Sequence, residues 1–297
     1  MKPLLYLTVL FITAAGIASC KHKKTNLTGG ADTAVIIHNK GVKIAYTDTS
    51  DISDTTLLFV HGWAINRSYW RKQVAYFGKR YRIVTIDLPG FGQSGKNRKD
   101  WSTNAFAGDV DSVIAALKLK KVILIGHSMS GDIVLQAAID NPDKVIGLVG
   151  VDNFNNPGAP QTEQAKKEYA AAVLQLKQHF KQVATAWFNQ QLFSKTTSPE
   201  IRKRVLNDVA KADSVIGVAS LEGGSDFKEI DKLKQAKKKL YLINSDVHPV
   251  DSTYLVANKI PFKIFYVPGS GHFPMIEHPQ IFNMLLDKVI LDINNKK

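Results

Sequence analysis

Short apolar runs alternate with longer amphipathic stretches along most of this chain. Two such runs, 34–38 and 42–46, flank the turn-forming segment 39–41, Asn-Lys-Gly, and this arrangement predicts a β-hairpin. From residue 56 onward, strand-like runs and helix-like stretches alternate, which is typical of a parallel sheet covered by helices. The predicted strands are 57–60, 82–86, 122–125, 145–149, 240–243 and 263–266. The predicted helices between and after these strands are 68–77, 103–117, 130–140 and 280–292.

One interval, between residues 151 and 240, breaks this alternation because it contains no strand-like run. Its apolar spacing predicts four helices, at 161–180, 182–193, 199–212 and 213–221. We therefore expect an α/β fold with a mostly parallel central sheet, whose core is formed by residues 34–152 and 230–297. We expect residues 153–229 to form a helical cap inserted after the sixth strand, with simple enlargement of the core as the alternative.

The first residues have the pattern of an export signal. Lys2 is followed by the apolar stretch 4–12, which is shorter than a typical membrane span, and then by small residues that lead to Cys20. Residues 17–20, Ile-Ala-Ser-Cys, resemble a bacterial lipobox, in which the cysteine becomes the lipidated first residue after cleavage. This predicts a signal peptide at 1–19, a lipidated tether at 20–33 and an exported bacterial lipoprotein that faces the periplasm or the cell surface. Ordinary secretion that leaves an unpaired thiol is the alternative.

Composition narrows the classes of function. The 297 residues are 44% hydrophobic, enough for a substantial core, and Cys20 is the single cysteine, so the globular part has no disulfides or thiolate metal sites. The formal net charge of +13 comes from scattered lysines and arginines without a nucleic-acid-binding signature, so we expect no nucleic-acid partner. The basic segment 21–24 lies next to Cys20, where it can contact anionic lipid headgroups. No cluster of His, Asp and Glu has metal-ligand spacing, and no cofactor is expected.

The segment 126–131, Gly-His-Ser-Met-Ser-Gly, lies between a strand-like run and a helix-like stretch. A serine on a sharp turn between a strand and a helix is the arrangement of a nucleophile elbow. The usual pattern is Gly-x-Ser-x-Gly, and here Ser130 stands where the second glycine is common, with Gly131 one residue later. Serine is small enough to replace glycine at position 130, so the motif still fits an elbow. Ser128, on the turn, is therefore the candidate nucleophile. Taken alone, the motif is equally compatible with a chance turn in a βα unit.

Two further motifs have the same order along the chain as in a known family. His61-Gly62-Trp63 follows a strand directly, and the segment 269–274, Gly-Ser-Gly-His-Phe-Pro, follows the last strand. Together with the elbow, residues 34–294 resemble the α/β-hydrolase fold, specifically its lidded serine hydrolases, which are esterase- and lipase-like. The resemblance implies an oxyanion hole formed by the backbone N–H groups of Trp63 and Met129. It also implies that His272 is the general base and that Asp87, in the turn after residue 86, has a structural role.

The acid that would orient His272 is left open by the sequence. The family usually places it just after the penultimate strand, where Asp246 is the only carboxylate in the turn, so Asp246 is our prediction. Some members place it after the preceding strand, which nominates Asp152, and Asp251 is a further alternative. With Asp246, the order Ser…Asp…His matches that of the fold.

These residues predict a serine hydrolase that cleaves carboxylic esters of small molecules through an acyl-enzyme. A serine at position 128 argues against the dehalogenase and epoxide-hydrolase relatives, which carry aspartate there. Acyltransferases and C–C bond hydrolases share the triad, so they remain alternatives. A surface-anchored binding protein that keeps the fold without turnover is the alternative from another class.

Overall fold

The structure is a computed structural model that describes residues 35–49 and 52–295. The predicted signal peptide, the tether at 20–33 and Cys20 lie outside the described residues.

The described residues form one eight-stranded sheet with the strand order β1-β2-β4-β3-β5-β6-β7-β8. β1 pairs antiparallel with β2, and β2 pairs antiparallel with β4, whereas the pairs from β4 to β8 are parallel. The strands are β1 (Val35–Asn39), β2 (Val42–Asp48), β3 (Thr55–Val60), β4 (Arg82–Ile86), β5 (Lys121–His127), β6 (Val145–Val151), β7 (Leu240–Ser245) and β8 (Phe262–Val267).

Local chemistry explains both kinds of strand. The central strands β3, β5, β6 and β7 are buried along nearly their whole length, because helices cover both faces of a parallel sheet, and they are accordingly apolar. The predicted hairpin is confirmed: Lys40 and Gly41 have φ values of 46° and 84°, which suit a two-residue turn between twisted strands.

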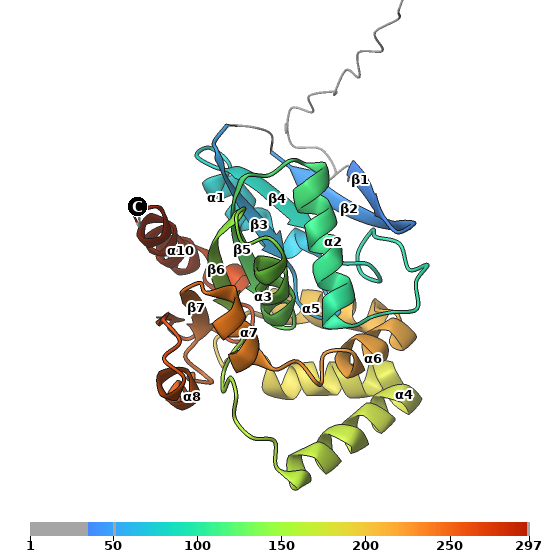
Figure 1. The fold of residues 1–297 in the computed structure, drawn as a ribbon. Coiled ribbons are helices and arrows are strands. Elements are labelled where there is room, and N and C mark those ends of the chain that lie inside the picture. The colour runs from blue at the N-terminus through green and yellow to red at the C-terminus, as the bar shows by residue number, and fades with distance from the viewer. Residues whose placement is uncertain (1–34, 50–51, 296–297) are drawn as a thin grey trace, which may run out of the picture. The chain divides into compact units, whose positions relative to one another are not determined.

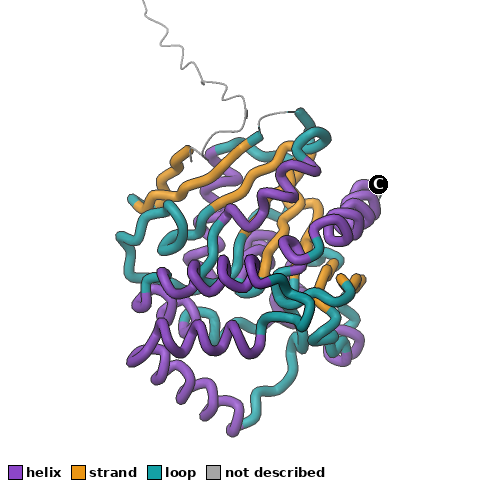
Figure 2. Tube along the Cα trace, turned by 180° about the vertical axis from the view of Figure 1, so that it is seen from behind, coloured by secondary structure: helices purple, strands orange, loops and turns teal. Residues whose placement is uncertain are grey.

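Helices lie on both faces of the sheet (Figure 1). α2 and α3 cover one face, whereas α1 and α10 lie on the other, as the view from behind shows (Figure 2). The helices are η1 (Arg67–Trp70), α1 (Arg71–Phe77), α2 (Thr103–Ala116), α3 (Ser130–Asp140), α4 (Glu163–Gln191), α5 (Pro199–Lys211), α6 (Ser214–Glu222), α7 (Glu229–Ala236), α8 (Thr253–Ala257), α9 (Pro274–Glu277) and α10 (Pro279–Asn294).

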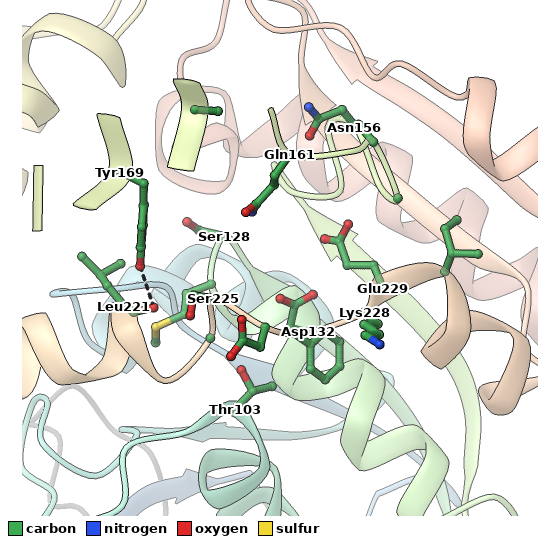
Figure 3. A pocket seen from close by; sticks show the side chains of 18 of the residues that line it. Thr103, Ser128, Asp132, Asn156, Gln161, Tyr169, Leu221, Ser225, Lys228 and Glu229 are labelled. Atoms are coloured by element: carbon green, nitrogen blue, oxygen red, sulfur yellow. Dashed lines mark hydrogen bonds between the residues drawn. The ribbon is translucent and has the colours of Figure 1, made fainter. Parts of the chain in front are cut away.

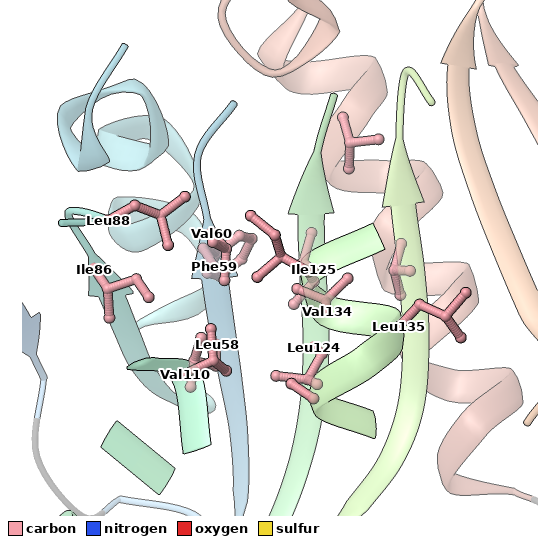
Figure 4. Packing of buried hydrophobic residues seen from close by; sticks show 14 of the residues in the cluster. Leu58, Phe59, Val60, Ile86, Leu88, Val110, Leu124, Ile125, Val134 and Leu135 are labelled. Atoms are coloured by element: carbon pink, nitrogen blue, oxygen red, sulfur yellow. The ribbon is translucent and has the colours of Figure 1, made fainter. Parts of the chain in front are cut away.

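The core lies between the sheet and these helices (Figure 4). Leu58 of β3 and Leu124 of β5 are fully buried, as are Val110 of α2 and Val134 of α3. Burial of such side chains stabilises the fold by about 1.5–3 kcal/mol each. This layer fixes the ends of β3, β5 and β6, from which the candidate site residues emerge.

The helical insertion after β6 is also observed, and the predicted fold class is confirmed. The interval 161–193, expected to hold two helices, contains the single element α4 (Glu163–Gln191), which His179 interrupts with φ −138° and ψ 45°. The predicted helices 199–212 and 213–221 correspond to α5 and α6, which begin at the side-chain caps Ser198 and Asp213. The short helices α7, α8 and α9 were not predicted.

Among the helices of the described residues, none combines the length and the apolar character needed to cross a lipid bilayer.

Candidate active site

Ser128 occupies a strained turn between β5 and α3. Its φ is 53°, in the left-handed region that non-glycine residues seldom adopt and that costs on the order of 1–3 kcal/mol. The turn is tight because α3 returns directly over the end of β5. A Cβ atom on Gly126 would lie 2.3 Å from the backbone oxygen of Ser130, so only glycine fits there. This is the geometry expected of a nucleophile elbow.

The departure from the usual Gly-x-Ser-x-Gly pattern has a structural reason. Ser130 is fully buried, and its hydroxyl donates a hydrogen bond of 2.5 Å to the backbone oxygen of His61. The residue that replaces glycine thus connects the elbow to the turn after β3. Gly131 meets a different need, because a Cβ atom there would lie 2.5 Å from Nδ2 of Asn153.

The His61-Gly62-Trp63 turn lies directly against the elbow. A Cβ atom on Gly62 would come within 3.0 Å of Cβ of Ser128 and within 2.6 Å of Nδ1 of His127. His61 is fully buried: its Nδ1 donates to the backbone oxygen of Gly62 at 2.8 Å, and its Nε2 accepts from the backbone N–H of Leu88 at 3.0 Å. Burial lowers the pKa of His61, so the ring is neutral and structural.

The two predicted oxyanion donors flank this contact. Met129 follows Ser128 at the start of α3, and Trp63 follows Gly62. The Trp63 indole is buried against the helical insertion: its Nε1 donates to the backbone oxygen of Gly217 at 2.8 Å. Its ring centroid lies 5.6 Å from that of Phe180 and 5.8 Å from that of Phe188. The side chain therefore joins the insertion to the turn that lies against the elbow.

His272 is paired with Asp152. Its Nδ1 lies 2.5 Å from Oδ2 of Asp152, and Oδ1 of the same carboxylate accepts the backbone N–H of Ser245 at 2.7 Å. The Asp152 side chain is 3% exposed and that of His272 is 17% exposed. Burial alone raises the pKa of Asp152, but the hydrogen bond and charge of His272, together with Ser245, outweigh it and lower this pKa. The buried carboxylate is therefore ionised at neutral pH.

The prediction that Asp246 pairs with His272 is wrong. Asp246 is exposed, and its carboxylate accepts the backbone N–H of Gly269 at 2.9 Å. Asp251 is exposed as well, and its carboxylate accepts the backbone N–H and the hydroxyl of Thr253 at the start of α8. The alternative acid, Asp152, occupies the position in front of the imidazole.

Strand length explains this outcome. β7 continues through Asn244 to Ser245, so Asp246 lies beyond the edge of the sheet. β6 ends at Val151, and Asp152, with φ 47°, turns directly over that edge, where the N–H of Ser245 meets its carboxylate. In the α/β-hydrolase pattern, glycine is common at the position of Asn244. Here the Asn244 side chain is buried and donates to the backbone oxygen of Asn153 at 2.8 Å.

His272 and the elbow are joined through His127. Its Nε2 donates to the backbone oxygen of His272 at 2.7 Å, and the two imidazole centroids are 4.8 Å apart. Burial, with a smaller contribution from the His272 charge, lowers the pKa of His127 to about 3, so its ring stays neutral.

Within the described residues, no direct hydrogen bond joins the Ser128 hydroxyl to the His272 ring. Such bonds are often long without substrate and tighten in the complex.

A cavity of about 1020 Å³ opens beside Ser128, between the sheet and the helical insertion (Figure 3). Trp63, Ser128 and Met129 line it from the side of the sheet, whereas Tyr169 and Trp187 of α4 line it from the insertion. The Tyr169 hydroxyl donates to the backbone oxygen of Leu221 at 2.9 Å, which links α4 to α6 at the rim. The cavity can therefore hold a small molecule next to the candidate nucleophile.

Two partly buried carboxyl groups on the cavity wall were not predicted. Asp132 and Glu229 lie on the same side of the cavity (Figure 3). Burial, followed by the charge of Glu229, raises the pKa of Asp132, and burial raises that of Glu229 to about 7. The only sequence feature that pointed to the cavity wall was the position of Asp132, one helical turn after Ser128. Glu229 lies about 100 residues later in the chain, at the start of α7.

Asp87 has the structural role predicted for it. Its fully buried carboxylate pairs with the guanidinium of Arg67 and accepts the backbone N–H groups of Arg67 and Gln93 at 2.8 and 2.9 Å. A Cβ atom on Gly92 would lie 2.3 Å from this carboxylate, which explains the glycine in that loop.

Within the described residues, no group of three or more His, Cys, Asp or Glu side chains is arranged to hold a metal ion.

The comparisons with known proteins agree with this geometry. The family model for the alpha/beta hydrolase fold matches residues 55–279. The AB hydrolase superfamily protein YisY of Bacillus subtilis is 31% identical over 186 residues, which cover 60% of this chain and 68% of that protein. A pimeloyl-(acyl-carrier protein) methyl ester esterase of Yersinia enterocolitica is 23% identical over 257 residues, 82% of this chain and 96% of that protein.

Solved structures show the same fold. An esterase from Thermogutta terrifontis superimposes with a TM-score of 0.76 at 21% identity, covering 88% of this chain and 98% of that one. An esterase from Exiguobacterium antarcticum has a TM-score of 0.73 at 22% identity, covering 86% of this chain and 98% of that one. The chain therefore belongs to the family of alpha/beta hydrolases.

Proposed function

We propose that this protein is a serine hydrolase that cleaves carboxylic esters through an acyl-enzyme, with Ser128, His272 and Asp152 as the triad. The observation that carries the proposal is the partly buried 2.5 Å hydrogen bond between Asp152 and His272, beside an elbow that holds Ser128 at a φ of 53°. A carboxylate, an imidazole and a strained serine serve together in nucleophilic acyl transfer.

Each group has a defined role in this mechanism. Ser128 attacks the ester carbonyl while Nε2 of His272 takes its proton, and Asp152 holds the imidazole tautomer and stabilises the imidazolium. The N–H groups of Trp63 and Met129 donate to the oxyanion, where one such donor contributes about 2.7–4 kcal/mol. His272 then protonates the leaving alcohol. It next activates water, which releases the acyl group and frees Ser128.

The ester specificity also has support from similar proteins. A relative from Yersinia enterocolitica is named as a methyl ester esterase, and the structural neighbours from Thermogutta terrifontis and Exiguobacterium antarcticum are named as esterases. The cavity beside Ser128 has room for a small ester.

An active-site fluorophosphonate probe tests the nucleophile. We expect the wild-type protein to be labelled at Ser128 and the Ser128→Ala variant to be unlabelled. Ser112→Ala is the matched control, because the Ser112 hydroxyl donates to the backbone oxygen of Gly108 within α2 at 2.8 Å, and its removal should leave labelling in place. A folded wild-type protein without labelling would favour the non-catalytic binding protein.

Hydrolysis of p-nitrophenyl esters of graded chain length tests the reaction. We expect turnover that requires Ser128 and His272, with the preferred chain length set by the cavity. Product analysis with added alcohols separates hydrolysis from acyl transfer, since an acyltransferase would form a new ester in place of the free acid.

We also propose that the insertion 153–229 acts as a cap over the site and that the mature protein is a lipoprotein anchored through Cys20. Tyr169 and Trp187 in the cavity wall support the first part. The lipobox-like segment 17–20 supports the second. Cell fractionation of the Cys20→Ala variant tests the anchor: we expect active enzyme in the soluble fraction, whereas unchanged membrane association would contradict it.

A further inference from the structure

We propose that Glu277 is a positioning residue that holds the backbone on both sides of His272 and ties it to the cap. The inference rests on the proposed function of His272 as the base. It concerns a carboxylate that touches none of the proposed reacting groups and acts on the base through the main chain.

The geometry around Glu277 is specific. Its Oε2 accepts the backbone N–H of Gly271 at 2.9 Å, and its Oε1 accepts the backbone N–H of Phe273 at 3.1 Å. One carboxylate thus bridges the residues immediately before and after His272. Its Oε2 also accepts the hydroxyl of Thr197 at 2.5 Å.

The backbone of His272 is held independently by two other parts of the molecule. Its N–H donates to the backbone oxygen of Leu192 at 2.8 Å, and its backbone oxygen accepts from His127 at 2.7 Å. A Cβ atom on Gly271 would lie 2.6 Å from the backbone oxygen of Leu192, so this approach is close. The backbone polar groups around the base are therefore fixed by Glu277, by the cap and by the elbow.

The cap side of this contact is the clasp segment, residues 192–197, which connects α4 to α5. Within it, Thr196 donates to the backbone oxygen of Gly269 at 2.6 Å, and Thr197 is buried and reaches Glu277. Arg202 of α5 donates to the backbone oxygen of Ser194 at 2.5 Å and holds the segment from behind. The clasp segment therefore binds the loop of the base through side chains and backbone alike.

This arrangement matters because the imidazole must face Asp152 and Ser128 at once. A misplacement of about 1 Å in such a group can lower the rate about 100-fold. A carboxylate accepts two N–H groups with its two oxygens, whereas a glutamine amide offers one oxygen and turns an NH2 group toward the other N–H. Glu277→Gln should therefore release one side of the loop while nearly preserving the volume of the side chain.

The experiment compares Glu277→Gln with the control Glu163→Gln, which makes the same chemical change on an exposed carboxylate paired with Lys166. We expect kcat of Glu277→Gln for a p-nitrophenyl ester to fall about 10- to 100-fold with KM within threefold. We also expect its downfield proton NMR signal from the His272–Asp152 hydrogen bond to weaken or disappear. Glu163→Gln should match the wild type in both measurements.

A kcat of Glu277→Gln within twofold of the wild type, or an undiminished downfield signal in a folded sample, would overturn the proposal. If Glu277→Gln does not fold, Thr197→Val removes only one donor to the same carboxylate and should lower kcat about twofold to tenfold. Unchanged kcat and an unchanged NMR signal in Thr197→Val would then overturn it. Failure of the proposed function is separate, since it appears as absent turnover in the wild type, whereas the NMR signal reports on Glu277 without turnover.

Discussion

The ends of β6 and β7 lie side by side in the sheet, yet they hold their aspartates in opposite environments. Asp152, at the end of β6, is buried between the His272 ring and the N–H of Ser245. Asp246, directly after β7, is exposed, and within the described residues its carboxylate accepts the backbone N–H of Gly269. Both residues follow parallel strands, and both contact the loop 268–273 around His272.

The environment of each aspartate is decided by the residue at which its strand ends. β7 runs to Ser245 and carries Asp246 past the edge, whereas β6 stops at Val151 and turns Asp152 over it. A buried carboxylate is costly unless it is paired, and Asp152 is paired on both oxygens. In this chain the buried, fully bonded carboxylate beside His272 therefore comes from the end of β6.

The largest expected effect comes from Asp152→Asn. The amide cannot hold the His272 tautomer that accepts the proton of Ser128, so we expect kcat to fall roughly 10⁴-fold with little change in KM. Steady-state kinetics on a p-nitrophenyl ester checks this. Activity within tenfold of the wild type would mean that Asp246 or another carboxylate serves as the acid.

Asn153→Ala tests how the loop after β6 is supported. The Asn153 amide donates to the backbone oxygens of Gly126 and Ser128 at 2.9 and 3.2 Å. Removing it leaves both carbonyls without this donor, so we expect the free energy of unfolding to fall by about 1–3 kcal/mol. Chemical denaturation measures the change, and a loss below about 0.5 kcal/mol would contradict the role given to this amide.

The lowered pKa of Asp152 predicts a pH dependence of stability. As the pH falls, the Asp152 carboxylate is protonated in the unfolded chain at a higher pH than in the folded protein. The stabilisation that the ionised Asp152 gives to the folded protein is therefore present above about pH 4 and is lost as the pH falls through the folded pKa. Each unit of the shift corresponds to about 1.4 kcal/mol. The difference in Tm between the wild type and Asp152→Asn should therefore narrow as the pH is lowered. A difference that stays constant across the acid range would show that Asp152 is not stabilised as an anion.

Asp246→Asn should have the smallest effect. The exposed carboxylate accepts the N–H of Gly269, and the amide oxygen of the introduced asparagine can accept the same N–H. We therefore expect kcat within about twofold of the wild type and a free energy of unfolding within about 0.5 kcal/mol of it. The same assay and denaturation series provide the measurement. A large loss of kcat in this variant, with Asp152→Asn nearly unaffected, would reverse the comparison.

Local patterns predicted most of the fold. The strands of the parallel sheet, the hairpin, α3 and the helices around 199–221 follow from apolar period, caps and turn residues, which act over a few neighbours. Local motifs also indicated the elbow at Ser128 and the loop of His272. The glycines and small residues in these motifs are there because a larger side chain would clash with nearby atoms. The short helices α7 to α9 were not predicted because they contain too few residues to show a helical period of apolar positions.

By itself, the sequence determined the order of strands and helices, the serine elbow and the histidine loop, since each depends on contacts between residues close along the chain. Only the tertiary structure decided that Asp152 faces His272, that Asp132 meets Glu229 on the cavity wall and that Glu277 bridges the backbone beside the base. The first two depend on how far neighbouring strands and inserted helices extend in space. The third depends on the fold of the turn into α9. Asp246, Asp152 and Asp251 all fit the sequence as the partner of His272, and burial with hydrogen bonding selects Asp152.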